Sequence, residues 1–161
     1  MTPRVWLATP SEAGIVAGLL VEFRDHSGHD WPSANSFLAS VERLMEQPSG
    51  EFLLGTPHDD SAPAGVCQLR YRHSVWTASD DCWLEDLFVR ETARGVGLGA
   101  ALVEAALDRA RERGCRRVEL DANEANEPAL ALYRRLGFSE RSKSPDGTGR
   151  DLFLGVRLDE L

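Results

Sequence analysis

Three glycines at alternate positions constrain this chain more than any other feature. Residues 94–99 read Arg-Gly-Val-Gly-Leu-Gly, between an apolar stretch at 83–90 that is typical of a strand and a helical pattern that begins near Leu98. Glycines leave the backbone amides of such a turn uncovered, and the first turn of a helix adds a partial positive charge. The sequence therefore predicts a strand–loop–helix unit that binds a phosphate group.

Three interpretations of this loop compete. It is a glycine-rich turn without a ligand, part of a dinucleotide-binding fold, or a site for the pyrophosphate of coenzyme A. Glu119, which follows the loop at the distance of the ribose-binding acid, favours the dinucleotide fold, but Gly99 comes one residue early for that motif. The residues after the loop are also too few to complete a doubly wound sheet. A Walker loop is excluded because no Gly-Lys-Ser/Thr follows.

Periodicity and turn residues predict the remaining elements. We expect strands at 4–8, 52–54, 65–71, 83–90, 117–121, from 137 and at 151–158, and helices at 12–24, 33–45, 98–113 and 128–136. The order is βααβββαβαββ, without repeats or linkers. It predicts an α/β (α+β) arrangement around a mixed sheet, in one domain covering residues 1–161.

Composition narrows the classes of partner. The chain has 26 acidic and 18 basic residues and a net charge of −8, which argues against a nucleic-acid partner and mildly favours a cationic substrate. Cys67, Cys82 and Cys115 form no CxxC motif, so we expect reduced thiols and no metal site. We also expect no signal peptide, and the longest apolar stretch, 15–21, is too short to cross a membrane. The predicted location is the cytoplasm.

Two segments resemble the signatures of one family. Residues 94–99 resemble the Arg/Gln-x-x-Gly-x-Gly/Ala signature of the GNAT superfamily of N-acetyltransferases, and Glu-Asp-Leu-Phe-Val at 85–89 is similar to that family's central strand. Residues 126–138 resemble its second signature, Asn-x-x-Ala-x-x-x-Tyr followed by Leu-Gly-Phe. The resemblance implies a mixed, mostly antiparallel central sheet with splayed central strands flanked by helices. It also implies an acetyl-CoA-dependent N-acetyltransferase and a possible homodimer, for which the strand at 151–158 would offer an edge.

The resemblance also implies where acetyl-CoA binds. In the family, the pyrophosphate lies on the amides of the glycine loop, and the pantetheine arm pairs with the central strand like an additional strand. This pairing needs the central strands to splay, which a β-bulge would supply. Arg94 either contributes charge or braces the loop, and Arg134 and Arg135 either meet the 3′-phosphate region or form a solvated helix face. The implied acetyl-CoA-binding residues are Leu87, Phe88, Val89, Arg94, Gly95, Val96, Gly97, Leu98, Gly99, Ala100, Asn126, Ala129 and Tyr133.

Two side chains carry the chemistry that the resemblance implies. Glu85 is the first candidate for the base that takes a proton from the substrate ammonium, with Asp86 beside it and Asp121 as a weaker candidate. Tyr133 matches the family's general acid, which protonates the leaving thiolate. The structural alternatives are a solvent-facing carboxylate for Glu85, a core tyrosine for Tyr133 and a helix N-cap for Asn126.

The loop after the first helix is the expected wall of the acceptor site. His26, His29, Asp30 and Trp31 are suited to a cation through charge and cation–π contact, although a polar loop anchored by Trp31 is the alternative. Asp80 and Asp81 would add acid to the same cleft, so a polyamine, an aminoglycoside or a peptide amine all remain open. Transfer of another acyl group, a hydroxyl acceptor and an acyl-CoA sensor without turnover are the competing functions.

Overall fold

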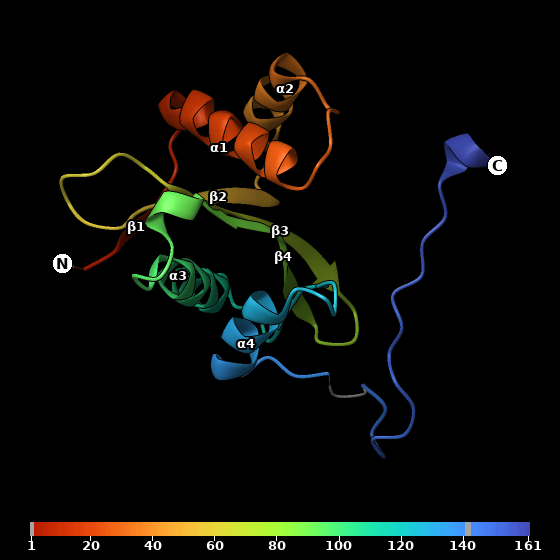
Figure 1. Ribbon diagram of the computed structural model, residues 1–161. Coiled ribbons are helices and arrows are strands. Elements are labelled where there is room, and N and C mark those ends of the chain that lie inside the picture. Colours follow the sequence, from red (N-terminus) through yellow and green to blue (C-terminus); the bar gives the residue numbers. More distant parts are fainter. Residues whose placement is uncertain (1, 141–142) are drawn as a thin grey trace. The chain divides into compact units, whose positions relative to one another are not determined.

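A five-stranded sheet with helices on both faces forms the first part of the computed structural model, which describes residues 2–140 and 143–161 (Figure 1). The chain divides into two compact units, Met1–Leu120 and Asp121–Leu161, and each is described by itself. A single acetyltransferase domain stays a prediction. The elements are β1 (Arg4–Leu7), α1 (Ala13–His26), α2 (Ala34–Met45), β2 (Gly50–Thr56), β3 (Gly65–Ser74), β4 (Ser79–Val89), α3 (Leu98–Glu112), β5 (Val118–Glu119) and α4 (Glu127–Arg135).

The sheet is mixed and mostly antiparallel, as the sequence predicts. Its strand order is β1-β2-β3-β4-β5. Each neighbouring pair from β1 to β4 is antiparallel, and the pair of β4 and β5 is parallel. That parallel pair joins only Cys82 to Val118 and Trp83 to Glu119. Among the residues that the structure describes, β4 therefore has no strand on its second side beyond Trp83, and the two strands part there.

Helices cover the two faces of the sheet unequally. The helices α1 and α2 pack on one face over a core that includes Val16, Phe52 and Phe88, while α3 contacts β1 to β4 on the other face (Figure 1). Glycines bring α3 close to the sheet: a Cβ at Gly55 would lie 2.7 Å from a Leu98 methyl, and one at Gly65 would lie 2.8 Å from Leu102. A side chain at either position would therefore force the Leu98 or Leu102 side chain, or α3 itself, to shift.

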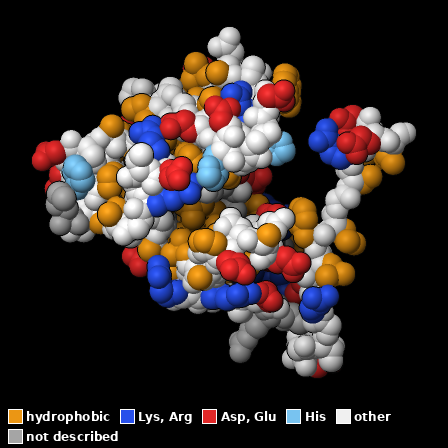
Figure 2. Space-filling model, in the orientation of Figure 1, with side chains coloured by type: hydrophobic (Ala, Val, Ile, Leu, Met, Phe, Trp, Pro, Cys, Tyr) orange, Lys and Arg blue, Asp and Glu red, His pale blue; other side chains and the backbone are white. Residues whose placement is uncertain are grey.

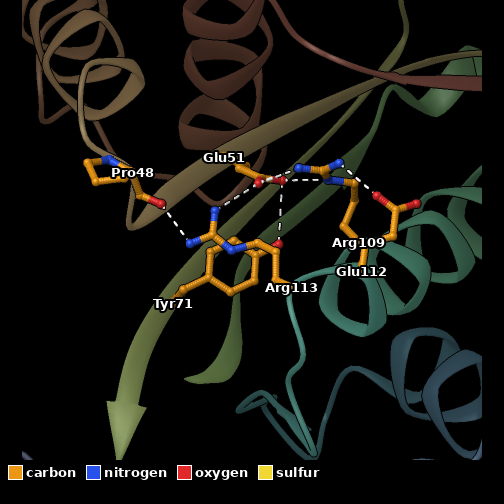
Figure 3. Close-up of polar contacts among 6 residues, drawn as sticks. All are labelled: Pro48, Glu51, Tyr71, Arg109, Glu112 and Arg113. Atoms are coloured by element: carbon orange, nitrogen blue, oxygen red, sulfur yellow. Dashed lines mark hydrogen bonds and ion pairs between the residues drawn. The ribbon is translucent and has the colours of Figure 1, made fainter. Parts of the chain in front are cut away.

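An ion-pair cluster ties α3 to the sheet near the end of the helix (Figure 3). Glu51 on β2 accepts two hydrogen bonds from Arg109, at 2.9 and 2.6 Å, and one from Arg113 at 3.2 Å. The Arg113 guanidinium also lies 3.9 Å from the centre of the Tyr71 ring. Burial alone would raise the pKa of the Glu51 carboxyl, but hydrogen bonds and charges from the two arginines outweigh burial and lower the pKa.

The last two predicted strands do not form within the described residues. Residues 137–140 and 143–157 hold no strand, and the chain ends with a short 3₁₀ turn, Leu158–Glu160. The strand-like pattern at 151–158 instead leaves apolar side chains in the open (Figure 2). Phe153 is 75% exposed and Leu154 is 84% exposed. A strand needs a hydrogen-bonding neighbour as well as a pattern, and the pattern alone was misleading here. The predicted strand at 117–121 likewise shortens to β5.

Candidate active site

The glycine loop has the conformation that its sequence predicts. After β4, a 3₁₀ turn (Glu91–Ala93) leads to Gly95 and Gly97, whose φ angles of 81° and 86° lie in the left-handed region. Other residues adopt this region only at a cost, whereas glycine adopts it freely. Gly97 is the N-cap of α3, so the helix starts directly after the loop.

The backbone amides of this loop are free to bind an anion. Within 2–140 and 143–161, no carbonyl or side chain accepts a hydrogen bond from the N–H groups of residues 95–100. Ala101 is the first residue of the region whose N–H is used, by the Gly97 carbonyl at 2.9 Å. The first turn of α3 also carries no acidic residue that would offset the helix dipole. Uncapped amides at the positive end of a helix suit a phosphate or pyrophosphate group.

Arg94 has a bracing role in this structure. Its Nε donates a hydrogen bond to the Val89 carbonyl at 2.9 Å, and its side chain is otherwise exposed. The bond joins the glycine loop to the end of β4. Of the two roles left open by the sequence, the structure therefore shows the brace, and a phosphate contact stays a prediction.

A β-bulge lies in β4 at Glu85. Asp86 pairs with Gln68 on β3 and Leu84 pairs with Leu69, which leaves Glu85 as an additional residue without a cross-strand partner. Glu85 is exposed, although Leu84 beside it is buried. A bulge of this kind bends the strand and redirects a side chain. The bulge that the splayed strands require is present, and it falls on the predicted base.

A small pocket opens on the α1 and α2 side of the sheet, with a volume of about 200 Å³. It combines three residues of α1, three of the following loop, one of α2 and one of β4: Leu20, Phe23, Arg24, Ser27, His29, Trp31, Phe37 and Asp86.

The pocket includes His29 and Trp31 of the four predicted substrate residues. His26 lies instead against Phe88, with 6.2 Å between the ring centres, and Asp30 is exposed outside the lining.

Asp86 of β4 lines this pocket, and the sequence analysis did not assign it to the acceptor site. It lies two residues before the buried Phe88, and because side chains alternate along a strand both face α1. That spacing was the available signal. Asp80 and Asp81, by contrast, do not reach the pocket: Asp81 is 3% exposed and bound to Arg117 at 2.9 Å, and Asp80 lies 3.4 Å from His73.

The second signature lies in the second unit. The Asn126 side chain caps α4 by accepting a hydrogen bond from the N–H of Ala129 at 3.4 Å. Tyr133 is 8% exposed and meets the Phe138 ring edge-on at 5.7 Å. Arg134 is paired with Glu140 on an exposed surface, which favours the solvated-face interpretation for this arginine. The structure thus shows the N-cap role of Asn126, and the cosubstrate roles of these residues stay predictions.

No group of three or more His, Cys, Asp or Glu side chains suited to a metal ion occurs in the part of the chain that the structure describes. In the same residues, none of the helices combines the length and the apolar character that crossing a membrane requires.

Comparison with known proteins places this geometry in a family. The model of the acetyltransferase (GNAT) family matches residues 17–138. An aminoglycoside N(6')-acetyltransferase type 1 of Stenotrophomonas maltophilia is 26% identical over 144 residues, which cover 88% of this chain and 89% of that protein. A thialysine N-epsilon-acetyltransferase of Sus scrofa is 29% identical over 104 residues, 62% of this chain and 60% of that protein.

Solved structures agree with the sequence relatives. The crystal structure of a "putative acetyltransferase" from Arthrobacter sp. FB24 matches with a TM-score of 0.83 and 28% identity, over 98% of this chain and 96% of that one. The relatives support the N-acetyltransferase activity that the sequence predicts. Since the family match extends over most of the chain, including both signatures, the chain belongs to the GNAT family of acetyltransferases.

Proposed function

We propose that this chain is an acetyl-CoA-dependent N-acetyltransferase, in which a primary amine attacks the thioester directly within a ternary complex. One observation carries the proposal: the unpaired side of β4, with its bulge at Glu85, leads within a few residues into the uncapped start of α3. An open strand edge suits an extended arm with amide groups, and free helix amides suit a pyrophosphate. Acetyl-CoA has both parts in this order.

The residues present fit the cosubstrate. The amides of residues 95–100 would hold the pyrophosphate, since their N–H groups find no acceptor in the described protein. The backbone of Leu87 and Val89 would hold the pantetheine arm, because both residues lie beyond Trp83, where β4 has no second neighbour. The amide of Leu87 or Phe88 would donate to the acetyl oxygen as negative charge develops there.

Proton transfer would fall to two side chains. Acetyl-CoA would supply the acetyl group as a thioester, and the CoA thiolate would be the leaving group. A primary alkylamine with a pKa of about 10 is protonated near neutral pH and needs to lose a proton before its nitrogen forms the new C–N bond. Glu85, exposed at the bulge, would accept that proton directly or through a water molecule. Tyr133 would donate its phenolic proton to the sulfur as the C–S bond breaks, and the second proton that the nitrogen loses as the amide forms would return to the phenolate.

A binding assay and a rate assay test the proposal together. Acetyl-CoA should raise the melting temperature of the protein and NAD should not, because the loop departs from the dinucleotide motif. A panel of amines then identifies turnover through release of the CoA thiol. Glu85→Gln should lower kcat by about a hundredfold or more while acetyl-CoA still stabilises the variant. Glu104→Gln, an exposed glutamate on α3, is the matched control and should behave like the wild type.

The outcomes separate the alternatives. Absence of stabilisation by either acetyl-CoA or CoA would refute the cosubstrate site. Stabilisation without turnover of any amine or alcohol would favour an acyl-CoA sensor. If Glu85→Gln left the rate unchanged, the proposed N-acetyltransferase activity would stand, but Glu85 would not be its base. The homodimer also stays a prediction, since the strand at 151–158 that was expected to support it does not form.

A further inference from the structure

The end of β4 is joined to α1 by an ion pair with two parallel hydrogen bonds. Arg90, directly after β4, donates from Nε to the Glu22 carboxylate at 2.8 Å and from Nη2 at 2.7 Å. These hydrogen bonds lower the pKa of the Glu22 carboxyl, so the pair is ionised at neutral pH. Two bonds from one planar guanidinium fix the orientation of a carboxylate as well as its distance. The pair therefore defines how this part of β4 lies against α1.

Stacked aromatic rings reinforce the same junction. Phe88 of β4 stacks on Phe23 of α1, with 5.2 Å between the ring centres and 19° between the planes. Phe88 and Arg90 lie two positions apart in an extended chain, so their side chains point to the same face of the sheet. Their partners, Phe23 and Glu22, are consecutive residues of α1. The backbone of Val89 is thus held between two contacts to one turn of α1.

The backbone groups of Val89 face the open side of β4. Val89 lies opposite Gly65, and the N–H of Arg90 donates to the Ala64 carbonyl at 2.8 Å. In an antiparallel ladder this makes Val89 and Gly65 a pair without hydrogen bonds to each other, so the Val89 N–H and carbonyl point away from β3. Arg94 reaches that carbonyl with its Nε at 2.9 Å. The position of this strand edge therefore depends on how the residues on either side of Val89 are held.

We infer that Glu22 is a positioning residue for the cosubstrate. Through Arg90, it holds the end of β4 and the adjoining 3₁₀ turn, Glu91–Ala93, in the orientation that places Val89 and the glycine loop for binding. The inference rests on the proposed function, because Val89 and the loop belong to the proposed acetyl-CoA site. Without the ion pair, this segment has more freedom before CoA binds, and the need to order it on binding lowers the affinity.

The ion pair contributes little to the stability of the fold itself. The Arg90 and Glu22 side chains are 38% and 41% exposed. Ion pairs that are open to water to this extent add only modestly to the free energy of unfolding. Loss of the pair should therefore change the affinity for CoA more clearly than it changes the melting temperature.

Calorimetric titration with CoA tests this inference without turnover. Glu22→Ala and Arg90→Ala should each raise the dissociation constant of CoA about three- to tenfold. The double variant should bind CoA no more weakly than Arg90→Ala, because both substitutions remove the same ion pair. Glu22→Gln keeps one acceptor oxygen and should fall between the wild type and Glu22→Ala. Hydrogen exchange in peptides that cover residues 88–94 should be faster in Glu22→Ala than in the wild type, and CoA should slow it.

The matched control is Asp108→Ala, which breaks an exposed ion pair with Arg111 at 2.9 Å on α3. This variant should bind CoA like the wild type. Melting curves without ligand show whether each variant is folded at the temperature of the titration, and the two Glu22 variants decide the question if Arg90→Ala does not fold.

The outcomes distinguish this inference from the proposed function. Wild-type affinity for CoA in Glu22→Ala would overturn the inference while the proposed function stands. The same holds if the losses of the two single variants add up in the double variant, or if exchange at 88–94 is unchanged. Failure of the wild type to bind CoA would overturn both.

Discussion

Replacing Glu51 by Gln keeps the shape of the side chain and removes its charge. The Glu51 side chain is 9% exposed and receives three hydrogen bonds from Arg109 and Arg113 (Figure 3). The substitution places an amide N–H₂ group against guanidinium donors, removes the carboxylate that pairs with Arg113, and leaves Arg109 with only the exposed carboxylate of Glu112. We expect Glu51→Gln to lower the free energy of unfolding by about 3 kcal/mol.

The expected loss in the free energy of unfolding follows from the burial of Glu51 and of its two arginine partners. Removing one partner of a buried ion pair costs about 3–5 kcal/mol. Arg109 and Arg113 are 29% and 27% exposed, so water recovers part of their solvation and the lower end of that range applies. For a chain of 161 residues, about 3 kcal/mol corresponds to a melting temperature roughly 6–12 °C lower. Urea denaturation followed by circular dichroism measures the difference.

The effect should depend on pH with a defined sign. Because the folded protein lowers the pKa of Glu51 below its ordinary 4.5, the carboxylate stabilises the fold above that value. The contribution is lost as the pH falls through the lowered pKa of the folded state. The stability difference between the wild type and Glu51→Gln should therefore be constant near neutral pH and shrink in acid.

The control variant is Glu112→Gln, which removes an exposed carboxylate that also pairs with Arg109. Glu112 accepts a hydrogen bond from Arg109 at 2.9 Å, but its side chain is 64% exposed. Glu112→Gln should cost at most about 0.5 kcal/mol. The reasoning would be refuted if Glu51→Gln cost no more than Glu112→Gln, or if its cost persisted unchanged in acid.

Three further predictions concern single positions. Gly97→Ala should lower the free energy of unfolding by about 1 kcal/mol and weaken CoA binding, because the φ of 86° at this position is left-handed. Gly18→Ala, at an exposed position of helix α1, should instead stabilise the fold by about 0.5–1 kcal/mol. Tyr133→Phe should lower kcat in thiol-release kinetics with little change in acetyl-CoA affinity. Burial raises the pKa of Cys67, and it raises the pKa of Cys82 to about 12, so mass spectrometry should find both unmodified by iodoacetamide until the protein unfolds.

Capping residues and glycines predicted the helix starts and turns that are determined by residues adjacent in the sequence. The capping residue Ser33 marks the start of α2, where its hydroxyl accepts a hydrogen bond from the N–H of Ser36 at 3.2 Å. Gly95 and Gly97 marked the turn into α3, because few other residues adopt its left-handed backbone. Apolar stretches bounded by turn residues likewise located β2 and β3 within a few positions.

Features that depend on contacts between residues far apart in the sequence were harder to predict. The pattern at 151–158 is that of a strand, yet no strand of the described chain pairs with it. The contribution of Asp86 to the pocket depends on how β4 lies against β3 and under α1, which no local pattern specifies. The same holds for Asp81, whose neighbour Arg117 lies far along the chain and withdraws the carboxylate from the surface.

The register of β4 has a consequence for changes in chain length. In a strand that is covered on both faces, losing one residue normally turns every following side chain to the wrong side. Glu85 is an exception, because Leu84 and Asp86 already pair with the consecutive residues Leu69 and Gln68. A chain shortened by this one residue would keep every cross-strand partner and gain a regular ladder. The fold thus carries at this point a residue that its pairing does not require, so the side chain there can serve chemistry without any demand from the sheet on its identity.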